Sequence, residues 1–360
     1  MGITIVQRVE MKSALKMRNK IPFILVASLA IGCTGSLSSE VVIEEAPAEK
    51  VCTLSSSGPL GQLRSLCIIS EGLFAANTFD SVLLFGSDGK LIREIGHQGR
   101  AAGEYVMPWC VRTHGSNLVV WDADQLKFIE YDQDGNYLAQ YQYDSALNDF
   151  RIDGDRIYIY TAGRRDESII DILNISDGQV MGIGPASVAH KALSHSVCGM
   201  PIGVQEGQCL FSPKDRLEVF RYDTDSDKAE TIGATVSHTF SVEESGNDPG
   251  IARSRKKLDA FLNASSRTVY VFCRDKSVYL VAMEGISERD ENNRLSNDGR
   301  YYSLYRMDGK KSDPKHYHMG SMGSSSLFAD YDGDLYYIVT EVDGMDEAVC
   351  LNKLSRKAYK

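Results

Sequence analysis

The chain has 360 residues, of which 43% are hydrophobic and 24% are charged. This composition excludes an intrinsically disordered chain, which would have few apolar residues, and a polytopic membrane protein, which would have several apolar runs of about 20 residues. The formal net charge of −10 argues against a nucleic-acid-binding protein, because such a protein needs a basic face to displace counterions from phosphates.

The first segment has the features of a bacterial secretion signal. A basic start, MRNK at 17–20, is followed by an apolar run from Ile21 to Gly32 and then by Cys33. The run is too short to span the roughly 30 Å hydrocarbon core of a bilayer as a helix. The ending LAIGC at 29–33 resembles a lipobox, whose cysteine is acylated. We therefore predict a signal peptide over 1–32 and lipidation of Cys33, with an ordinary signal peptide as the alternative.

Cleavage of this signal makes the remaining chain more acidic. Residues 1–32 contain five basic residues and one acidic residue, so the net charge of the mature chain is −14. Anionic lipid head groups would repel this acidic mature chain, and we therefore expect it to contact the membrane through the acyl chains alone. Residues 33–50 are predicted to form a lipidated tether. Because no acidic cluster follows Cys33 directly, we expect an outer-membrane location that faces the periplasm.

The chain after the tether carries a repeat of short strands. Apolar strands alternate with turn residues, and long stretches with a 3.6-residue period are missing. A first hairpin turn recurs six times, at Gly72, Gly115, Gly154, Gly207, Lys276 and Gly333. The mean spacing of about 50 residues is typical of a four-stranded propeller blade. We predict an all-β, six-bladed β-propeller as one domain over 51–360, with blades at 64–97, 109–143, 148–184, 198–233, 267–319 and 326–360. A two-sheet sandwich would not explain the repeat count.

The last repeat is one strand short. After the strand AVCLNKL at 348–354 only six residues remain, which is too few for another hairpin strand. The segment Val51–Ser55, before the first repeat, can supply the missing outer strand. Closing the ring in this way removes an exposed sheet edge. We therefore predict that an N-terminal strand completes the last blade.

A loop between the first two repeats points to a family. The sequence GHQGRAAGEY at 96–105, with Pro108 three residues later, resembles the G-x-x-G-x-G-P-G-E-F/Y…P loop of six-bladed β-propeller lipoproteins of Bacteroidetes-type bacteria, which are NHL-like and TolB-like. Ala101 and Ala102 depart from the Gly and Pro of that pattern. The resemblance implies a six-bladed fold and a lipid anchor, and it implies no common reaction.

Two long insertions indicate a functional face. The segment 237–266 joins the fourth and fifth repeats, and 284–300 joins two strands within the fifth repeat. In four-stranded blades these two loop types lie on one face, and binding loops are usually carried by a rigid scaffold. Surface insertions without function are the alternative. Asp248 and Pro249 are expected to begin a helix, whose apolar side would contain Ile251, Leu258 and Leu262.

The same face is predicted to carry mixed charge and one tryptophan. Arginines can hold a carboxylate or sulfate through two hydrogen bonds, and a tryptophan can stack on a sugar. The candidate ligand-binding residues are Arg100, Glu104, Trp109, Arg164, Arg165, Arg253 and Arg255. The alternatives are a solvated helix face for Arg253 and Arg255, and packing between blades for Trp109.

Catalytic and metal-binding patterns are scarce. None of the seven histidines belongs to an HExxH motif, and the alternating pair His316 and His318 lacks a recognisable third ligand. We predict no catalytic residue, metal site or cofactor. With Cys33 acylated, an odd number of cysteines remains, so at least one thiol is free. We expect buried thiols, with Cys198 and Cys209 as the pair that could form a disulfide.

These features favour a binding protein over an enzyme. We expect a monomeric, lipid-anchored module of the cell envelope that binds a small molecule or an envelope protein through the insertion-bearing face. A metal-dependent propeller hydrolase or lyase with a site at the central channel is the alternative. An envelope scaffold that uses its whole rim is a third possibility.

Overall fold

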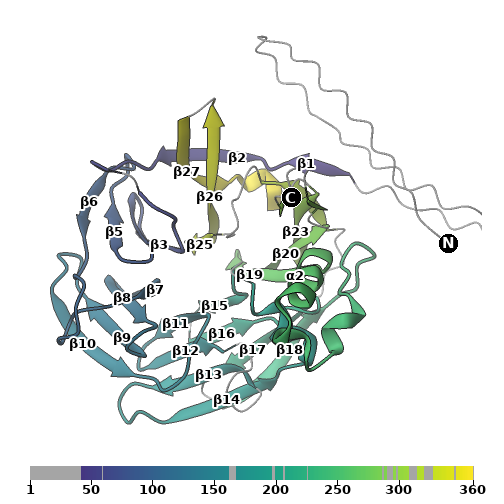
Figure 1. The fold of residues 1–360 in the computed structure, drawn as a ribbon, viewed down its shortest axis with the longest axis horizontal. Coiled ribbons are helices and arrows are strands. Elements are labelled where there is room, and N and C mark those ends of the chain that lie inside the picture. Colours follow the sequence, from purple (N-terminus) through teal and green to yellow (C-terminus); the bar gives the residue numbers. More distant parts are fainter. Residues whose placement is uncertain are drawn as a thin grey trace, which may run out of the picture.

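Six sheets are arranged as blades around a central axis (Figure 1). The computed structural model describes residues 42–58, 60–161, 168–196, 199–205, 207–224, 226–285, 288–289, 295–296, 299–307, 314–319, 327–343 and 346–359. The predicted six-bladed β-propeller fold is confirmed, and each blade has four antiparallel strands.

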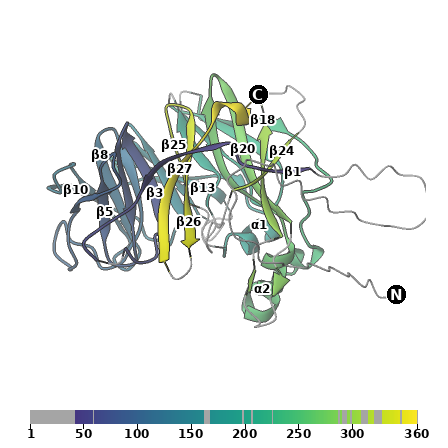
Figure 2. The same cartoon turned by 90° about the horizontal axis from the view of Figure 1, so that it is seen from above.

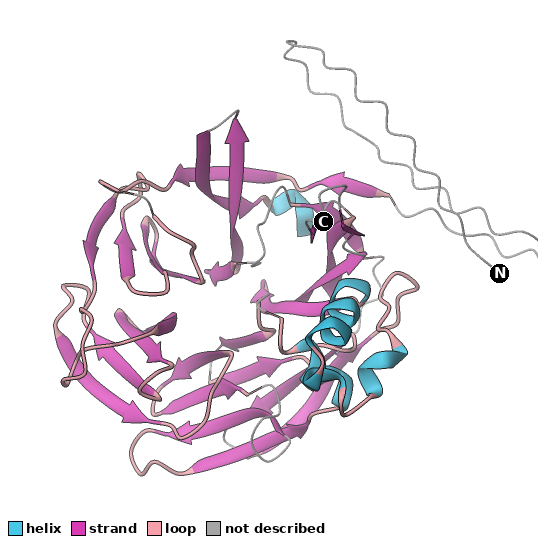
Figure 3. Ribbon diagram, in the orientation of Figure 1, coloured by secondary structure: helices cyan, strands magenta, loops and turns pink. Residues whose placement is uncertain are grey.

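In the first five blades the strands follow one another outward from the axis in chain order (Figure 3). The first blade contains β3 (Ser65–Ser70), β4 (Leu73–Asn77), β5 (Val82–Phe85) and β6 (Leu91–Glu94). The second contains β7 (Pro108–His114), β8 (Asn117–Asp122), β9 (Lys127–Tyr131) and β10 (Tyr137–Gln142). The third contains β11 (Asp149–Asp153), β12 (Arg156–Tyr160), β13 (Ser168–Asn174) and β14 (Val180–Pro185).

The other three blades carry the insertions and the chain ends. The fourth contains β15 (Ile202–Gln205), β16 (Gln208–Phe211), β17 (Glu218–Asp223) and β18 (Lys228–Ala234). The fifth contains β19 (Arg267–Arg274), β20 (Ser277–Gly285), β23 (Arg300–Arg306) and β24 (Lys315–His318). The sixth contains β25 (Phe328–Tyr331), β26 (Asp334–Asp343), β27 (Asp346–Leu354) and, from the other end of the chain, β2 (Ala48–Thr53).

The core lies between neighbouring blades, which explains the continuous apolar runs in the inner strands. All four residues of β5 are buried, whereas three of the four residues of the outer strand β6 are exposed. Between the first two blades, Leu84 of β5 packs in one cluster with Val111 of β7 and Val120 of β8. A strand that is covered on both faces needs apolar side chains at every position, and the outer strands do not.

The N-terminal segment joins three blades. The strand β2 pairs antiparallel with β27, so the predicted completion of the last blade is confirmed. A second short strand, β1 (Ile43–Glu45), adds in parallel to the edge of β24 in the fifth blade, and Ser55 forms a bridge with Lys90 in the first blade. We call residues 43–55 the N-terminal strap.

The strap corrects the predicted tether. The tether was expected to extend to residue 50, but β1 and the first half of β2 already lie within that range. The free edges of β24 and β27 offer unpaired backbone groups, and pairing with them orders a segment whose side chains are mostly exposed. The predicted signal peptide and Cys33 lie outside the described residues.

The two α-helices, α1 (Val188–Leu193) and α2 (Arg255–Ala264), lie on one side of the ring (Figure 2), and the 3₁₀ helix η3 (Arg356–Tyr359) ends the described chain near the opposite side. The prediction that a helix starts at Pro249 is wrong. The Asp248 carboxylate accepts from the backbone N–H of Gly250 at 2.8 Å and closes a turn there, and α2 begins only after Ser254, whose hydroxyl caps it. Two short 3₁₀ helices, η1 (Glu244–Asn247) and η2 (Ile251–Arg253), precede α2.

The apolar side of the first insertion is as predicted. Ile251 and Leu258 are buried together with Phe261, and the partly buried Leu262 packs against them. Their partners include Leu193 of α1, which belongs to a third insertion, 186–201, between the third and fourth blades. No periodic pattern in the sequence predicts this six-residue helix.

Arg300 connects the two insertions that were predicted to share a face. Its guanidinium donates to the carbonyls of Leu262, Asn263 and Ser265 at the end of α2, at 2.7 to 2.9 Å, and to Gly285 O at 2.6 Å. A cation at a helix C-terminus satisfies carbonyls that have no partner within the helix. Within the second insertion, β21 (Glu288–Arg289) and β22 (Leu295–Ser296) form a small hairpin.

The cysteines of the described residues form no disulfide. They are Cys52, Cys67, Cys110, Cys209, Cys273 and Cys350, and all except the partly buried Cys273 are buried. Cys209 therefore does not form the disulfide considered above, and Cys198 lies outside the described residues. Within the described part of the chain, no helix is long and apolar enough to cross a membrane.

Candidate functional site

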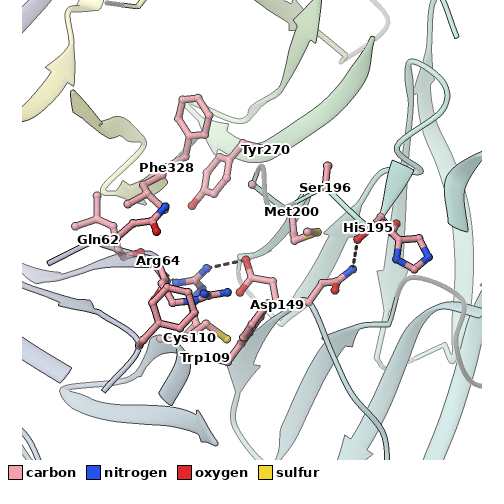
Figure 4. Close-up of a pocket in the computed structure, with 18 residues that line it drawn as sticks. Gln62, Arg64, Trp109, Cys110, Asp149, His195, Ser196, Met200, Tyr270 and Phe328 are labelled. Carbon is pink, nitrogen blue, oxygen red and sulfur yellow. Dashed lines mark hydrogen bonds and ion pairs between the residues drawn. The ribbon is translucent and has the colours of Figure 1, made fainter. Parts of the chain in front are cut away.

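A pocket of about 310 Å³ lies at the mouth of the central channel (Figure 4). Its walls come from the beginnings of inner strands: Arg64 precedes β3, Trp109 lies in β7, Asp149 begins β11 and Phe328 begins β25. The loop between α1 and β15 supplies a further wall. Because this loop follows α1, the pocket opens on the face that carries the helices. We call it the channel-mouth pocket.

Arg64 is held in this pocket by two aromatic rings. Its guanidinium carbon lies 3.7 Å from the centre of the Trp109 ring and 4.1 Å from that of Phe79. Cation–π contacts of this kind stabilise a guanidinium and fix its plane. The Nε of Arg64 is buried and donates no hydrogen bond to any described residue. Burial also lowers the pKa of Arg64, although a guanidinium keeps its charge at neutral pH.

The floor of the pocket contains a buried carboxylate between two arginines. Arg112 donates to Asp149 Oδ2 at 2.7 Å, and Arg151 donates to Asp149 Oδ1 at 3.1 Å. Burial by itself would raise the pKa of Asp149, but the two arginines outweigh it and hold this pKa below its ordinary value. The carboxylate is therefore charged and occupied by protein donors.

The same network continues across the channel to the fifth and sixth blades. Arg151 donates to the hydroxyl of Tyr270 at 3.3 Å, and that hydroxyl donates to Asp330 at 2.6 Å. Burial raises the pKa of Asp330 despite the hydrogen bond from Tyr270. Inner strands of four blades are thus linked by polar contacts around the axis.

The insertion that contains α2 does not line the pocket itself but supports one of its walls. Leu193 at the end of α1 packs against Leu258 and Phe261 of α2. The loop that follows, including Ser196 and Met200, faces the pocket and is tied to the third blade by a hydrogen bond from Asn148 to Ser194 O at 3.1 Å. The position of this wall therefore depends on α2.

Among the predicted candidates that the structure describes, Trp109 alone lines the pocket. Arg100 pairs with Asp124 at 2.8 Å, and Glu104 accepts from Ala101 N at 2.8 Å within its own loop. The hydrogen bond from Ala101, with that from His97, lowers the pKa of Glu104.

The remaining candidates lie away from the pocket or outside the described residues. Arg253 is exposed at the end of η2, and Arg255 is exposed and pairs with Asp259 one turn along α2. Arg164 and Arg165 lie outside the described residues. Their roles stay predictions.

The loop at 96–105 has a structural explanation. Tyr105 is buried and its hydroxyl donates to Ile95 O at 3.0 Å, while Tyr131 of the second blade donates to Gly103 O at 2.9 Å. A Cβ on Gly96, which has a φ of +67°, would lie 2.7 Å from the hydroxyl of Tyr131. The motif that carries the family resemblance therefore joins two blades.

Sequence reasoning missed Arg64, Arg112, Asp149, Arg151 and Tyr270, which come from four different repeats. The repeat itself contained a usable signal. Counted back from the turn, Arg112, Arg151 and Asp330 occupy the same place, three residues before Gly115, Gly154 and Gly333. Residues two apart on a strand share a face, so the charged positions three and five before the turn both point toward the channel.

Metal ligands do not cluster in the described part of the chain, where no three His, Cys, Asp or Glu side chains lie together in a suitable group. Of the predicted histidine pair, His316 shares a hydrogen bond with Ser303 at 2.7 Å, and His318 lies 3.4 Å from Glu45 of the strap.

Comparison with known proteins agrees with this architecture. Residues 55–232 match a family model that is described as a 6-bladed beta-propeller. The chain is a six-bladed β-propeller. A comparison with curated protein sequences gave no match.

Two solved structures resemble the propeller. One, from Bacteroides fragilis, is described as an exported protein; it is 11% identical, has a TM-score of 0.56 and matches over 87% of this chain and 95% of its own. The other, a member of the duf4221 family from Bacteroides vulgatus, is 10% identical, has a TM-score of 0.56 and matches over 86% of this chain and 94% of its own. At these identities the likeness concerns the fold alone. The NHL-like and TolB-like assignments stay predictions.

Proposed function

We propose that this propeller is a binding module of the bacterial cell envelope and that its ligand occupies the channel-mouth pocket. The observation that carries the proposal is the pocket itself, which is lined by five blades and the loop before the fourth and contains a guanidinium held between two rings. Pockets at the mouth of a closed barrel or ring are common ligand sites because the surrounding sheets hold their walls still. The proposed role is recognition, without a chemical step.

The proposed location rests on the N-terminal sequence. The basic and apolar segment at 17–32 followed by Cys33 supports export and lipid attachment. A structurally similar protein of Bacteroides fragilis is described as exported, which agrees with this location. We propose attachment to the outer membrane, facing the periplasm.

Ligand retention tests the binding function. The purified protein is incubated with a small-molecule extract of the envelope, washed and denatured, and the released compounds are identified by mass spectrometry. We expect the wild type to release compounds that a Phe79→Ala/Trp109→Ala variant does not retain. Leu138→Ala, which removes an exposed apolar side chain on the outer strand β10, is the matched control. Equal retention by the double variant would contradict the proposal.

Fractionation tests the anchor. We expect the full-length wild type in the membrane fraction of a bacterial host and Cys33→Ala in the soluble fraction. Cys273→Ala changes a partly buried thiol in β19 and should stay with the membrane. If Cys33→Ala remains membrane-bound after a high-salt wash, the proposed lipid anchor is wrong.

A further inference from the structure

The charges of the channel-mouth pocket do not balance. The pocket is lined by two arginines, Arg64 and Arg112, and by one carboxylate, Asp149. Both oxygens of Asp149 are used, since Oδ2 accepts from Arg112, and Oδ1 accepts from Arg151 and from Phe150 N at 2.7 Å. No described carboxylate lies within ion-pairing distance of Arg64. One positive charge at the pocket surface is therefore uncompensated.

The uncompensated charge is accompanied by buried donors that lack acceptors. The Nε atoms of Arg64 and Arg112 are both buried, and neither donates to a described residue. A buried donor without a partner costs about 1–3 kcal/mol, and more when it is charged. A bound acceptor would recover this cost, whereas an apolar or cationic ligand would not.

The rest of the lining favours a small ligand with an apolar part. Trp109 and Phe79 flank the guanidinium, and Leu66, Leu327 and Phe328 add apolar surface beside it. A volume of about 310 Å³ lies at the lower end of the range for ligand pockets. Since the chain as a whole is acidic, attraction of an anion has to come from these local groups.

We infer that the channel-mouth pocket binds a small ligand through an oxyanion, either a carboxylate or a phosphate or sulfate, that accepts hydrogen bonds from Arg64. The inference rests on the proposed binding function and adds the chemical class of the ligand. Trp109 and Phe79 hold the guanidinium and cover the apolar part of the ligand, and they are positioning residues for Arg64. Oxyanions pair with a guanidinium through two parallel hydrogen bonds, which suits a side chain whose plane is already fixed.

Matched probes test the ligand class by titration calorimetry with the whole mature protein. Benzoate, phenyl phosphate and phenyl sulfate carry the three oxyanions on one ring, and benzamide is the neutral counterpart of benzoate. We expect at least one oxyanion to bind about tenfold or more tightly than benzamide, because a hydrogen bond to a charged group contributes about 1.5–3 kcal/mol. The order of the three anions identifies which oxyanion the site prefers.

Variants separate the role of charge from that of shape. Arg64→Met keeps an unbranched apolar side chain but removes the guanidinium, and it should reduce the preference for the anion over benzamide to less than about threefold, since it removes the charge-assisted hydrogen bonds. Arg64→Lys, which keeps the charge, should retain part of that preference. Arg93→Met removes an exposed arginine that is paired with Asp134 and should leave binding unchanged. Circular dichroism and the melting temperature establish that each variant is folded.

The outcomes distinguish this inference from the proposed function. If the anions and benzamide bind equally and the Phe79→Ala/Trp109→Ala variant loses both, the pocket binds ligands and the oxyanion inference is wrong. The inference also fails if the compounds retained from envelope extract are neutral and no anionic probe binds. If no probe binds and no compound is retained, both proposals are overturned. The wild-type comparison of benzoate with benzamide decides the question even when Arg64→Met does not fold.

Discussion

At the scale of single residues, the innermost strands of this propeller carry charged side chains that are largely buried. Arg112 and Asp149 are buried and Arg151 is partly buried around the channel, although buried ions are costly unless they are paired. Arg112 and Arg151 both donate to Asp149, and Arg112 also lines the pocket. The same group of residues therefore contributes to the stability of the ring and to the electrostatics of its mouth.

Replacement of the shared carboxylate should be strongly destabilising. Asp149→Ala leaves two buried guanidinium groups without their partner, and we expect a loss of about 3–5 kcal/mol in the free energy of unfolding. Glu230→Ala, which breaks the exposed pair with Arg221, should cost less than about 1 kcal/mol. Urea denaturation of both variants checks this. Equal losses would mean that Asp149 is not the centre of the network.

A buried histidine should make stability depend on pH. His190 of α1 is fully buried and accepts a hydrogen bond from Lys214 N at 3.0 Å. Burial, followed by the charge of Lys214, lowers the pKa of His190 from 6.5 to about 3. The unfolded chain takes up a proton below pH 6.5 and the folded chain does not, so the stability present above pH 6.5 is lost progressively as the pH falls toward 3.

The melting temperature at pH 7.5 and at pH 5 measures this effect. We expect the wild type to lose up to about 1.4 kcal/mol per pH unit through His190, in addition to the losses from other groups. His190→Asn keeps an acceptor near Lys214 N and removes the titrating ring, so its stability should fall less between the two pH values. An identical fall in both proteins would contradict the assignment.

At the scale of elements, the N-terminal strap depends on a close approach to a hairpin. Gly89 follows Asp88 in the turn between β5 and β6, and its carbonyl accepts from Ser55 N at 2.9 Å. A Cβ at Gly89 would lie 2.2 Å from the carbonyl oxygen of Thr53, and the φ of this glycine is +78°. Only a glycine allows both the turn and the passage of the strap.

A matched pair of turn variants isolates this contact. Gly178 follows Asp177 in the equivalent turn of the third blade, where φ is +71° and a Cβ would meet no other atom within 4 Å. Gly178→Ala should cost about 1–2 kcal/mol through its backbone conformation alone. Gly89→Ala should cost a further 1–3 kcal/mol, roughly the penalty for overpacking. Thermal unfolding compares them, and equal melting temperatures would exclude the contact with the strap as a source of stability.

The elements also show what sequence could and could not predict. The blades and their boundaries were predictable because turn residues such as Asp88–Gly89 recur at regular spacing between apolar strands, which are local signals. The parallel strand β1 was not, since the polar sequence at 43–45 pairs only because β24 leaves a free edge. The pocket was missed for a similar reason, because Arg64, Trp109 and Asp149 meet through ring closure and not through proximity in the chain.

At the scale of the whole molecule, the N-terminal strap closes the ring. It contacts the first, fifth and sixth blades, so the two ends of the repeat array are joined by one short segment. Leu54 and Cys52 of the strap are buried in the core that the first and sixth blades share. Without it, the outer edge of β27 would be unpaired.

Two truncations test the closure. Removal of residues 1–47 deletes β1 and keeps β2, whereas removal of residues 1–55 deletes both. We expect the shorter truncation to remain monomeric with a small drop in melting temperature. The longer one should melt several degrees lower and associate at high concentration, because an unpaired edge recruits other strands. Light scattering and calorimetry measure both effects, and identical behaviour of the two truncations would show that β2 does not close the ring.

The strap also limits how far the protein can stand from a membrane. In the lipid-anchored form proposed above, nine residues, 34–42, separate Cys33 from β1. A fully extended chain covers at most about 3.6 Å per residue, so the rim of the fifth blade would be tethered within about 35 Å of the bilayer surface. A linker of this length allows the ring to tilt but keeps it close to the membrane surface. Any ligand that the ring binds therefore has to reach this region.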